Sequence, residues 1–244
     1  MPQIFSRGAN IVPLKIILVL GALATGAVGA VWYYFTPKYT KVGYMPPQPI
    51  PFSHKIHAGQ LGLDCRYCHS FVETAAHSNI PAAQVCMNCH SQVQKDSPKL
   101  EPLRQAWATG NPIPWVQIHK TPDYAYFNHS VHINRGVSCV SCHGRIDQME
   151  VVYQDQPLSM KWCLECHRAP ENAIRPLDKV TDLAWQPPTN GGELAALLGV
   201  DPAVLELKAD TKLSPSKAQT VMGTFLKNKR DIHAPDANCA GCHR

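Results

Sequence analysis

Long apolar runs are scarce in this sequence of 244 residues, except near the N-terminus, and 21 of the residues are proline. Such a chain cannot build a conventional core from long helices or strands, because proline interrupts both. We therefore predict short α-helices and loops, with little β-structure and no large sheet, wrapped around something other than their own side chains.

No cysteine lies outside one short motif, C-x-x-C-H, which occurs five times and uses all 10 cysteines. A disulfide framework would not need a histidine after every second cysteine, and zinc ribbons pair one C-x-x-C with another, so five copies do not suit them. The motif is typical of covalent c-type haem, in which both sulfurs bind the porphyrin and the histidine binds iron. We predict five covalently bound haem c groups, attached through Cys65, Cys68, Cys86, Cys89, Cys139, Cys142, Cys163, Cys166, Cys239 and Cys242, with His69, His90, His143, His167 and His243 as iron ligands.

A strong charge imbalance is also absent, since the formal net charge is +5. Taken alone, this charge would suggest nucleic acid or anionic lipid as a partner. Each haem, however, brings two propionates and, when ferric, about one net positive charge on the iron–porphyrin unit, so five haems would leave the oxidised protein near neutrality. The basic residues are interpreted as partners of propionates, and no nucleic acid partner is expected.

One uncharged stretch, Ile16–Phe35, is long enough to cross a bilayer as a helix, with aromatic residues at its outer end. Small residues at 28–30 leave a cleaved signal peptide as the alternative, but the apolar run exceeds a usual signal core. Haem attachment to C-x-x-C-H takes place outside the cytoplasmic membrane. We therefore predict an uncleaved transmembrane anchor over residues 1–36, single-pass in the cytoplasmic (inner) membrane, with the haem domain in the periplasm and the lipid bilayer as a partner.

The middle of the chain contains an internal repeat. FSHKIH at Phe52–His57 matches FNHSVH at Phe127–His132, and the haem motifs that follow recur at nearly the same offset. Each copy reads F-x-H-x-x-H, a haem motif, a spacer and a second haem motif. We predict a Pro-rich linker over 37–51, duplicated two-haem modules within 52–170 (52–90 and 127–167), and a C-terminal region, 171–244, with helices and the fifth haem.

The helices of the C-terminal region have clear sequence signals. Ser214 is suited to cap a helix with Pro215 in its first turn, and apolar residues including Met222 and Leu226 share one face of it. A shorter helix is predicted in GGELAALLG. These elements either close over the last haems or form a docking surface, and the sequence does not distinguish the two.

Histidines outside the attachment motifs are candidates for the second axial position of each iron. Residues three apart on a helix lie on the same side, one turn along, so each H-x-x-H pair can serve two neighbouring irons. This pattern predicts four distal ligands: His54, His57, His129 and His132. Candidates for the fifth are His119, Met149 and Met160, with His233 a further possibility, and spacing does not separate them. His77 is interpreted as a packing or polar residue.

Four segments resemble a known family: HAGQLGLDCRYCH, NIPAAQVCMNCH, FNHSVHINRGVSCVSCHGRIDQME and PLSMKWCLECHR. They are similar to the pentahaem cytochrome c subunit of alternative complex III, a bacterial quinol-oxidising respiratory or photosynthetic complex. The resemblance covers about Pro51–Pro188, the terminal CHR and the anchor, and is weaker over Gly191–Asp231. It implies a multihaem cytochrome c that relays electrons from an iron–sulfur subunit resembling molybdopterin oxidoreductases, beside integral membrane quinol-binding subunits. The implied acceptor is a monohaem cytochrome c subunit, another soluble electron carrier or a terminal oxidase.

Two other functions remain open. A stand-alone membrane-anchored quinol dehydrogenase, donating to a periplasmic reductase, would also carry one N-terminal helix, but its haems would follow the helix directly. Here a proline-rich stretch separates the apolar run from the first motif. An enzyme acting on a small oxyanion at an open haem is disfavoured, because spare ligands are numerous and no motif replaces its histidine with lysine. We predict an electron-transfer subunit with no catalytic residue of its own.

Overall fold

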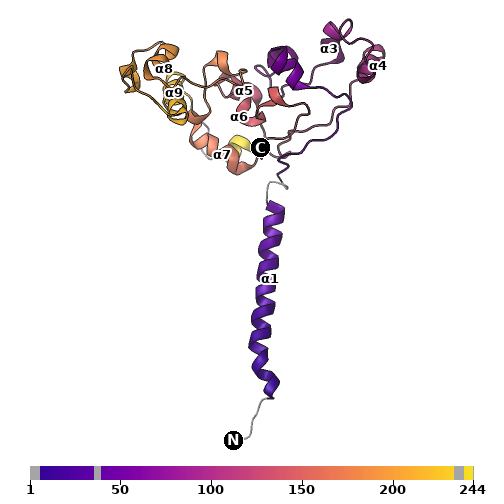
Figure 1. The fold of residues 1–244 in the computed structure, drawn as a ribbon, viewed down its shortest axis with the longest axis vertical. Coiled ribbons are helices and arrows are strands. Elements are labelled where there is room, and N and C mark those ends of the chain that lie inside the picture. Colours follow the sequence, from indigo (N-terminus) through magenta and orange to yellow (C-terminus); the bar gives the residue numbers. More distant parts are fainter. Residues whose placement is uncertain (1–5, 36–39, 234–238, 244) are drawn as a thin grey trace. The chain divides into compact units, whose positions relative to one another are not determined.

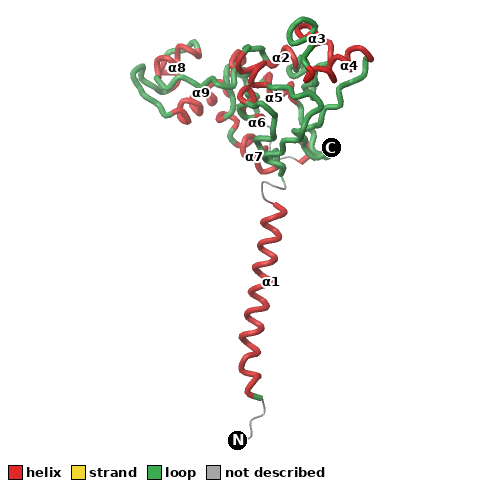
Figure 2. Tube along the Cα trace, turned by 45° about the vertical axis from the view of Figure 1, so that its right-hand side comes forward, coloured by secondary structure: helices red, strands yellow, loops and turns green. Residues whose placement is uncertain are grey.

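The computed structural model describes residues 6–35, 40–233 and 239–243, and these residues form helices joined by loops (Figure 2). No β-strand occurs among them, and only two isolated bridges pair backbone segments, Val137 with Ile174 and Asn190 with Lys212. The predicted fold class, short helices with little β-structure, is confirmed. The chain divides into two compact units, one ending at Val42 and one beginning at Gly43.

The first unit consists mainly of helix α1 (Val12–Phe35), which follows a 3-10 turn, η1 (Arg7–Ile11) (Figure 1). Pro13 lies in its first turn, where a missing N–H leaves no hydrogen bond unmade. Within the helical stretch Gly8–Phe35, a window of 18 residues reaches a mean hydropathy of 2.2. By length and composition this helix could anchor the chain in a membrane.

The second unit carries short helices, five of which hold the attachment motifs. They are α2 (Cys65–Cys68), α3 (Ala83–His90), α4 (Glu101–Thr109), α5 (His129–Asn134), α6 (Val140–His143), α7 (Met160–Arg168), α8 (Gly191–Leu198), α9 (Pro215–Lys229) and α10 (Cys239–Cys242). Each C-x-x-C-H motif lies on or directly beside one of five helices, α2, α3, α6, α7 and α10. A helical turn suits the motif, because it places residues three apart, here the two cysteines, on the same side.

Polar residues begin several of these short helices. The side chains of Asp64, Asn128 and Ser159 accept hydrogen bonds from backbone N–H groups in the first turns of α2, α5 and α7. Such caps satisfy donors that have no partner inside a helix. Helices of four to nine residues are therefore defined locally, without a long apolar face.

The first H-x-x-H pair departs from an ordinary α-helix. His54 precedes a π-helical segment, η2 (Lys55–Gln60), in which the N–H of Leu61 donates to the carbonyl of Ile56. A side chain at Gly59 would collide with the carbonyl of Asp147, so η2 lies directly against the backbone of that segment. The second pair lies on α5, an α-helix as predicted.

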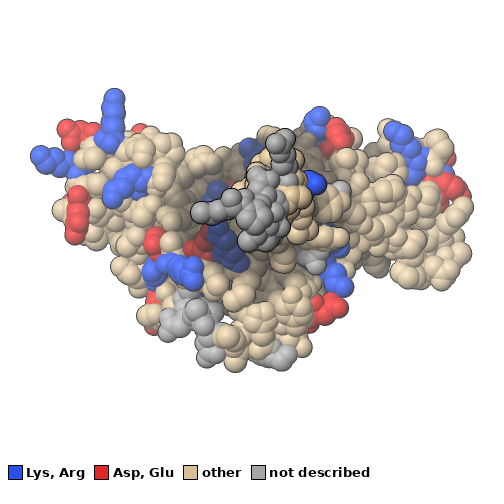
Figure 3. Space-filling model, turned by 90° about the horizontal axis from the view of Figure 1, so that it is seen from below, with Lys and Arg blue, Asp and Glu red and all other residues tan. Residues whose placement is uncertain are grey.

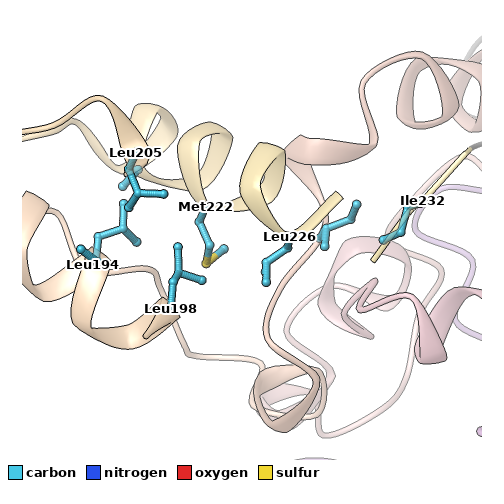
Figure 4. Packing of buried hydrophobic residues seen from close by; sticks show 9 residues of the cluster. Leu194, Leu198, Leu205, Met222, Leu226 and Ile232 are labelled. Atoms are coloured by element: carbon cyan, nitrogen blue, oxygen red, sulfur yellow. The ribbon is translucent and has the colours of Figure 1, made fainter. Parts of the chain in front are cut away.

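Helices α8 and α9 form where the sequence predicts them. Asn190 caps α8 by accepting from the N–H groups of Gly192 and Glu193, and Ser214 caps α9 by accepting from that of Lys217. Their facing sides pack into a hydrophobic cluster that includes Leu194, Leu198, Leu205, Met222, Leu226 and Ile232 (Figure 4). Leu194 and Met222 are fully buried. This cluster is the main hydrophobic core of the described residues.

The repeat region has a much smaller core of its own. Its buried cluster consists of Val72, Ile133 and Val180, with Cys139 packed against it. Figure 3 shows one face of the molecule, where basic and acidic side chains lie among wide uncharged areas. Apolar side chains alone therefore provide little burial around the attachment motifs.

Candidate haem-binding sites

The two copies of F-x-H-x-x-H have almost the same side-chain geometry. Phe52 meets His54 edge-on, with ring centres 4.8 Å apart, and Phe127 meets His129 at the same distance and angle. The second histidine of each copy lies beside the same phenylalanine, at 4.3 Å for His57 and 4.5 Å for His132. Each phenylalanine thus fixes two imidazoles, a role that the sequence analysis did not assign, although the residue recurs in both copies.

Backbone carbonyls fix the tautomer of the second histidine in each copy. Nδ1 of His57 lies 2.8 Å from the carbonyl oxygen of Ser53, and Nδ1 of His132 lies 2.7 Å from that of Asn128. Because a carbonyl only accepts, Nδ1 carries the proton and Nε2 keeps a free lone pair. This arrangement is typical of histidine that binds a metal through Nε2.

Four more imidazoles are held in the same way by backbone carbonyls. Nδ1 of His129 lies 2.8 Å from the carbonyl oxygen of Ala76, in the first copy of the repeat. The motif histidines His69, His90 and His243 bond the carbonyls of Asn79, Val93 and Tyr124. Their Nε2 atoms are therefore also the ones left free to bind a metal.

Three pairs of imidazoles are spaced so that one iron would fit between the two rings. In each pair, one histidine comes from a C-x-x-C-H motif and the other from an H-x-x-H pair. The ring centres are 6.1 Å apart for His57 and His90, 6.1 Å for His132 and His167, and 6.4 Å for His129 and His143. A metal–imidazole bond is about 2 Å long, so two axial imidazoles on one iron have ring centres roughly 6 Å apart. The residues present fit a porphyrin iron.

Burial favours the neutral form of five imidazoles. Burial is the main cause that lowers the pKa of His143 to about 3, and the neighbouring imidazole of His119 lowers it further. Burial is also the main cause that lowers the pKa of His54 to about 4, and there the neighbouring imidazole is His69. Burial likewise lowers the pKa of His119, His129 and His132. Neutral imidazole is the form that binds a metal.

Three buried ring nitrogens have no hydrogen-bond partner: Nδ1 of His54, Nε2 of His119 and Nδ1 of His143. Buried polar atoms are normally paired, so each of these needs an explanation. An imidazole nitrogen directed at iron would be satisfied by coordination, which suits Nε2 of His119.

The candidates for the fifth distal ligand lie in different surroundings. His119 is half-buried, with its ring centre 4.4 Å from that of His143 and nearly perpendicular to it, too close for the two to share one iron. Met149 is buried, whereas the side chain of Met160 is 62% exposed. His233 is exposed and pairs with Asp231 at 2.8 Å. Of the four, His119 has a buried nitrogen without a hydrogen-bond partner.

The cysteines are arranged for attachment rather than for cross-linking. None of the ten, all within the described part of the chain, forms a disulfide. No group of three or more His, Cys, Asp or Glu side chains within the described ranges could hold a bare metal ion. A structural zinc needs four such ligands, whereas a porphyrin iron needs only two axial ones.

Comparisons with known proteins agree with this geometry. The model of the family described as cytochrome c7 and related cytochrome c matches residues 50–105 and 125–184. The multihaem cytochrome c subunit of menaquinone reductase from Nitratidesulfovibrio vulgaris (strain Hildenborough) is 29% identical over 150 residues, which cover 57% of this chain and 65% of that protein. This chain is therefore a multihaem cytochrome c, and its residues 50–105 and 125–184 belong to the cytochrome c7 and related cytochrome c family.

Proposed function

We propose that this chain is the electron-relay subunit of a membrane quinol oxidoreductase complex. The observation that carries the proposal is the pairing of imidazoles with ring centres roughly 6 Å apart, because two strong axial ligands leave an iron no position for a substrate. In this proposal all five motifs carry covalent haem c. The haems, when bound, supply reversible one-electron chemistry.

The residues of the chain orient and tune these groups. Ten cysteines attach the porphyrins, and carbonyls hold six of the imidazoles with Nε2 free to face the iron. We assign His57, His129 and His132 as the distal partners of His90, His143 and His167, on the distances given above. By the repeat, His54 is the partner of His69. His119 is our choice for the fifth distal ligand.

The similarity to a subunit of menaquinone reductase supports the proposal that a partner of this chain reacts with quinones. The match covers 65% of that protein, so we do not assign all of its partner subunits to this chain. On the resemblance described above, we assign the chain more narrowly to alternative complex III. Its partners would then be an iron–sulfur subunit, integral membrane quinol-binding subunits, and a monohaem cytochrome or other carrier as acceptor.

The proposed location follows from the same chemistry. Haem attachment outside the cytoplasmic membrane places the second unit in the periplasm, and α1 would remain uncleaved as the anchor. The proline-rich segment before Phe52 would act as a spacer between them. Such a spacer disfavours a haem lying directly beside a quinol in the bilayer.

Dependence on partner subunits tests the proposed function. The purified chain, fully loaded and in detergent, is expected to stay oxidised when mixed with a menaquinol analogue, because in this proposal the quinol site belongs to a partner subunit. The complex purified from native membranes should become reduced by the same quinol within the mixing time. Absorbance at the haem bands measures both.

Dithionite reduction of the purified chain serves as the control, since it shows that the haems themselves accept electrons. Rapid reduction of the isolated chain by the quinol would contradict the relay function. It would favour the stand-alone quinol dehydrogenase instead.

A further inference from the structure

We propose that the five attachment sites form one unbranched line whose order differs from their order in the sequence. Numbered along the chain, the sites are the first (Cys65–His69), second (Cys86–His90), third (Cys139–His143), fourth (Cys163–His167) and fifth (Cys239–His243). In space the line runs second, first, third, fourth, fifth. This inference rests on the proposed relay function and adds the route.

The second site is joined to the first. Asn88, inside the second motif, donates from its side-chain nitrogen to the hydroxyl of Tyr67, inside the first motif, over 3.1 Å. The imidazole that faces His90 is His57, which lies three residues after His54. One short segment thus reaches both sites.

The first site is joined to the third through two residues from a distant segment. The hydroxyl of Thr181 donates to the carboxylate of Asp64, directly before the first motif, over 2.9 Å. The carbonyl of the adjacent Val180 accepts from the N–H of Cys139, where the third motif begins. The side chains of Cys65 and Cys139 also lie next to each other. The two motifs therefore begin side by side.

The third site is joined to the fourth by helix α5. His129 and His132 lie one turn apart on it, and their rings face His143 of the third motif and His167 of the fourth. Helices α5, α6 and α7 lie close together in Figures 1 and 2. The irons of the third and fourth sites would therefore each take one ligand from the same turn of α5.

The fourth site is joined to the fifth by the segment before α5. Phe127 packs against His132, the imidazole that faces the fourth motif. The neighbouring Tyr126 donates its N–H to the carbonyl of Cys242 over 2.8 Å. The carbonyl of Tyr124 accepts from Nδ1 of His243. Four consecutive residues, 124–127, thus contact both sites.

These four links use the first, third and fourth sites twice each, and the second and fifth sites once each. Exposure follows the same pattern: Cys89 and Cys239, in the two end sites, are the exposed cysteines, whereas the third motif is half-buried throughout. The second and fifth sites are therefore the ends at which electrons arrive and leave.

Photoreduction from one end tests this order. All native cysteines of the loaded protein are in thioether bonds, so Val93→Cys adds one free thiol beside the second site, at a side chain that is 57% exposed. A ruthenium photosensitiser on this thiol injects one electron per flash and is restored by a sacrificial amine. On protein immobilised on a resin, repeated flashes should reduce every haem that the label can reach through the line.

Two matched variants, each lacking one haem, discriminate between the possible orders. Removing the first site by Cys65→Ser with Cys68→Ser should leave only the second-site haem reducible from the label. Removing the fifth by Cys239→Ser with Cys242→Ser should leave all four remaining haems reducible. Reduction of the third to fifth sites in the first-site variant would overturn the proposal, because a line in sequence order predicts that result.

The unmodified chain provides a second test if either variant fails to fold. Anomalous scattering from crystals of the loaded protein locates each iron, and the map assigns it to its motif. The second-site iron should have the first-site iron as its nearest neighbour. A second-site iron lying between two others would contradict the line. Neither test involves quinol, so failure here leaves the relay function standing.

Discussion

Replacing His129 with alanine is expected to give a loaded protein in which one haem binds carbon monoxide. The ring of His129 lies 6.4 Å from that of His143 and almost parallel to it, so its removal takes away one strong axial ligand. That haem should become high-spin, with the others remaining low-spin. Visible spectra with and without carbon monoxide measure the change, which is expected to involve about one haem per chain.

His77→Ala is the matched control, because His77 is an exposed histidine in the segment that holds His129. All haems should remain low-spin in this variant. The same assay separates the candidates for the fifth ligand: His119→Ala should create a carbon monoxide site, and Met160→Ala should not. If His77→Ala acquires carbon monoxide binding and His129→Ala does not, both assignments are wrong.

A chain produced without haem attachment is expected to lose its structure over residues 52–170. Buried apolar side chains are few in this region, and its one buried cluster joins Val72 and Ile133 to Val180, too little apolar burial to offset the entropy of ordering so many residues. Helices α8 and α9 share a larger cluster and should keep more of their structure. Hydrogen exchange should be at least about tenfold faster in the repeat region than in these helices.

The loaded protein is the control for this comparison, since both regions should be protected when the porphyrins are in place. Protection of residues 52–170 in the haem-free chain, equal to that of α8 and α9, would contradict the view that the porphyrins form most of that region's core. The test concerns stability and is independent of any electron acceptor.

Local features of the fold could be read from the sequence. The signals Ser214-Pro215 and GGELAALLG predicted α9 and α8, because caps and apolar periodicity are local properties. The recurring phenylalanine and histidines similarly predicted equivalent ligand pairs. These predictions needed no knowledge of contacts between distant segments.

Long-range features could not be read in this way. The carbonyls that hold His129 and His243 come from Ala76 and Tyr124, which lie 53 and 119 positions away in the chain. Every residue type carries the same backbone carbonyl and can offer it to the same imidazole, so side-chain identity gives no signal. The order of the attachment sites depends on contacts of this kind, which explains why spacing alone did not give it.

Haem stoichiometry tests the central claim most directly. The protein should be extracted with acid–acetone, which removes non-covalent haem, and the intact mass of the remaining chain measured. With five C-x-x-C-H motifs occupied, all haem should stay on the protein, and the mass should exceed that of the polypeptide by five haems. Loss of haem into the solvent, or a mass increase of fewer than five haems, would contradict the account.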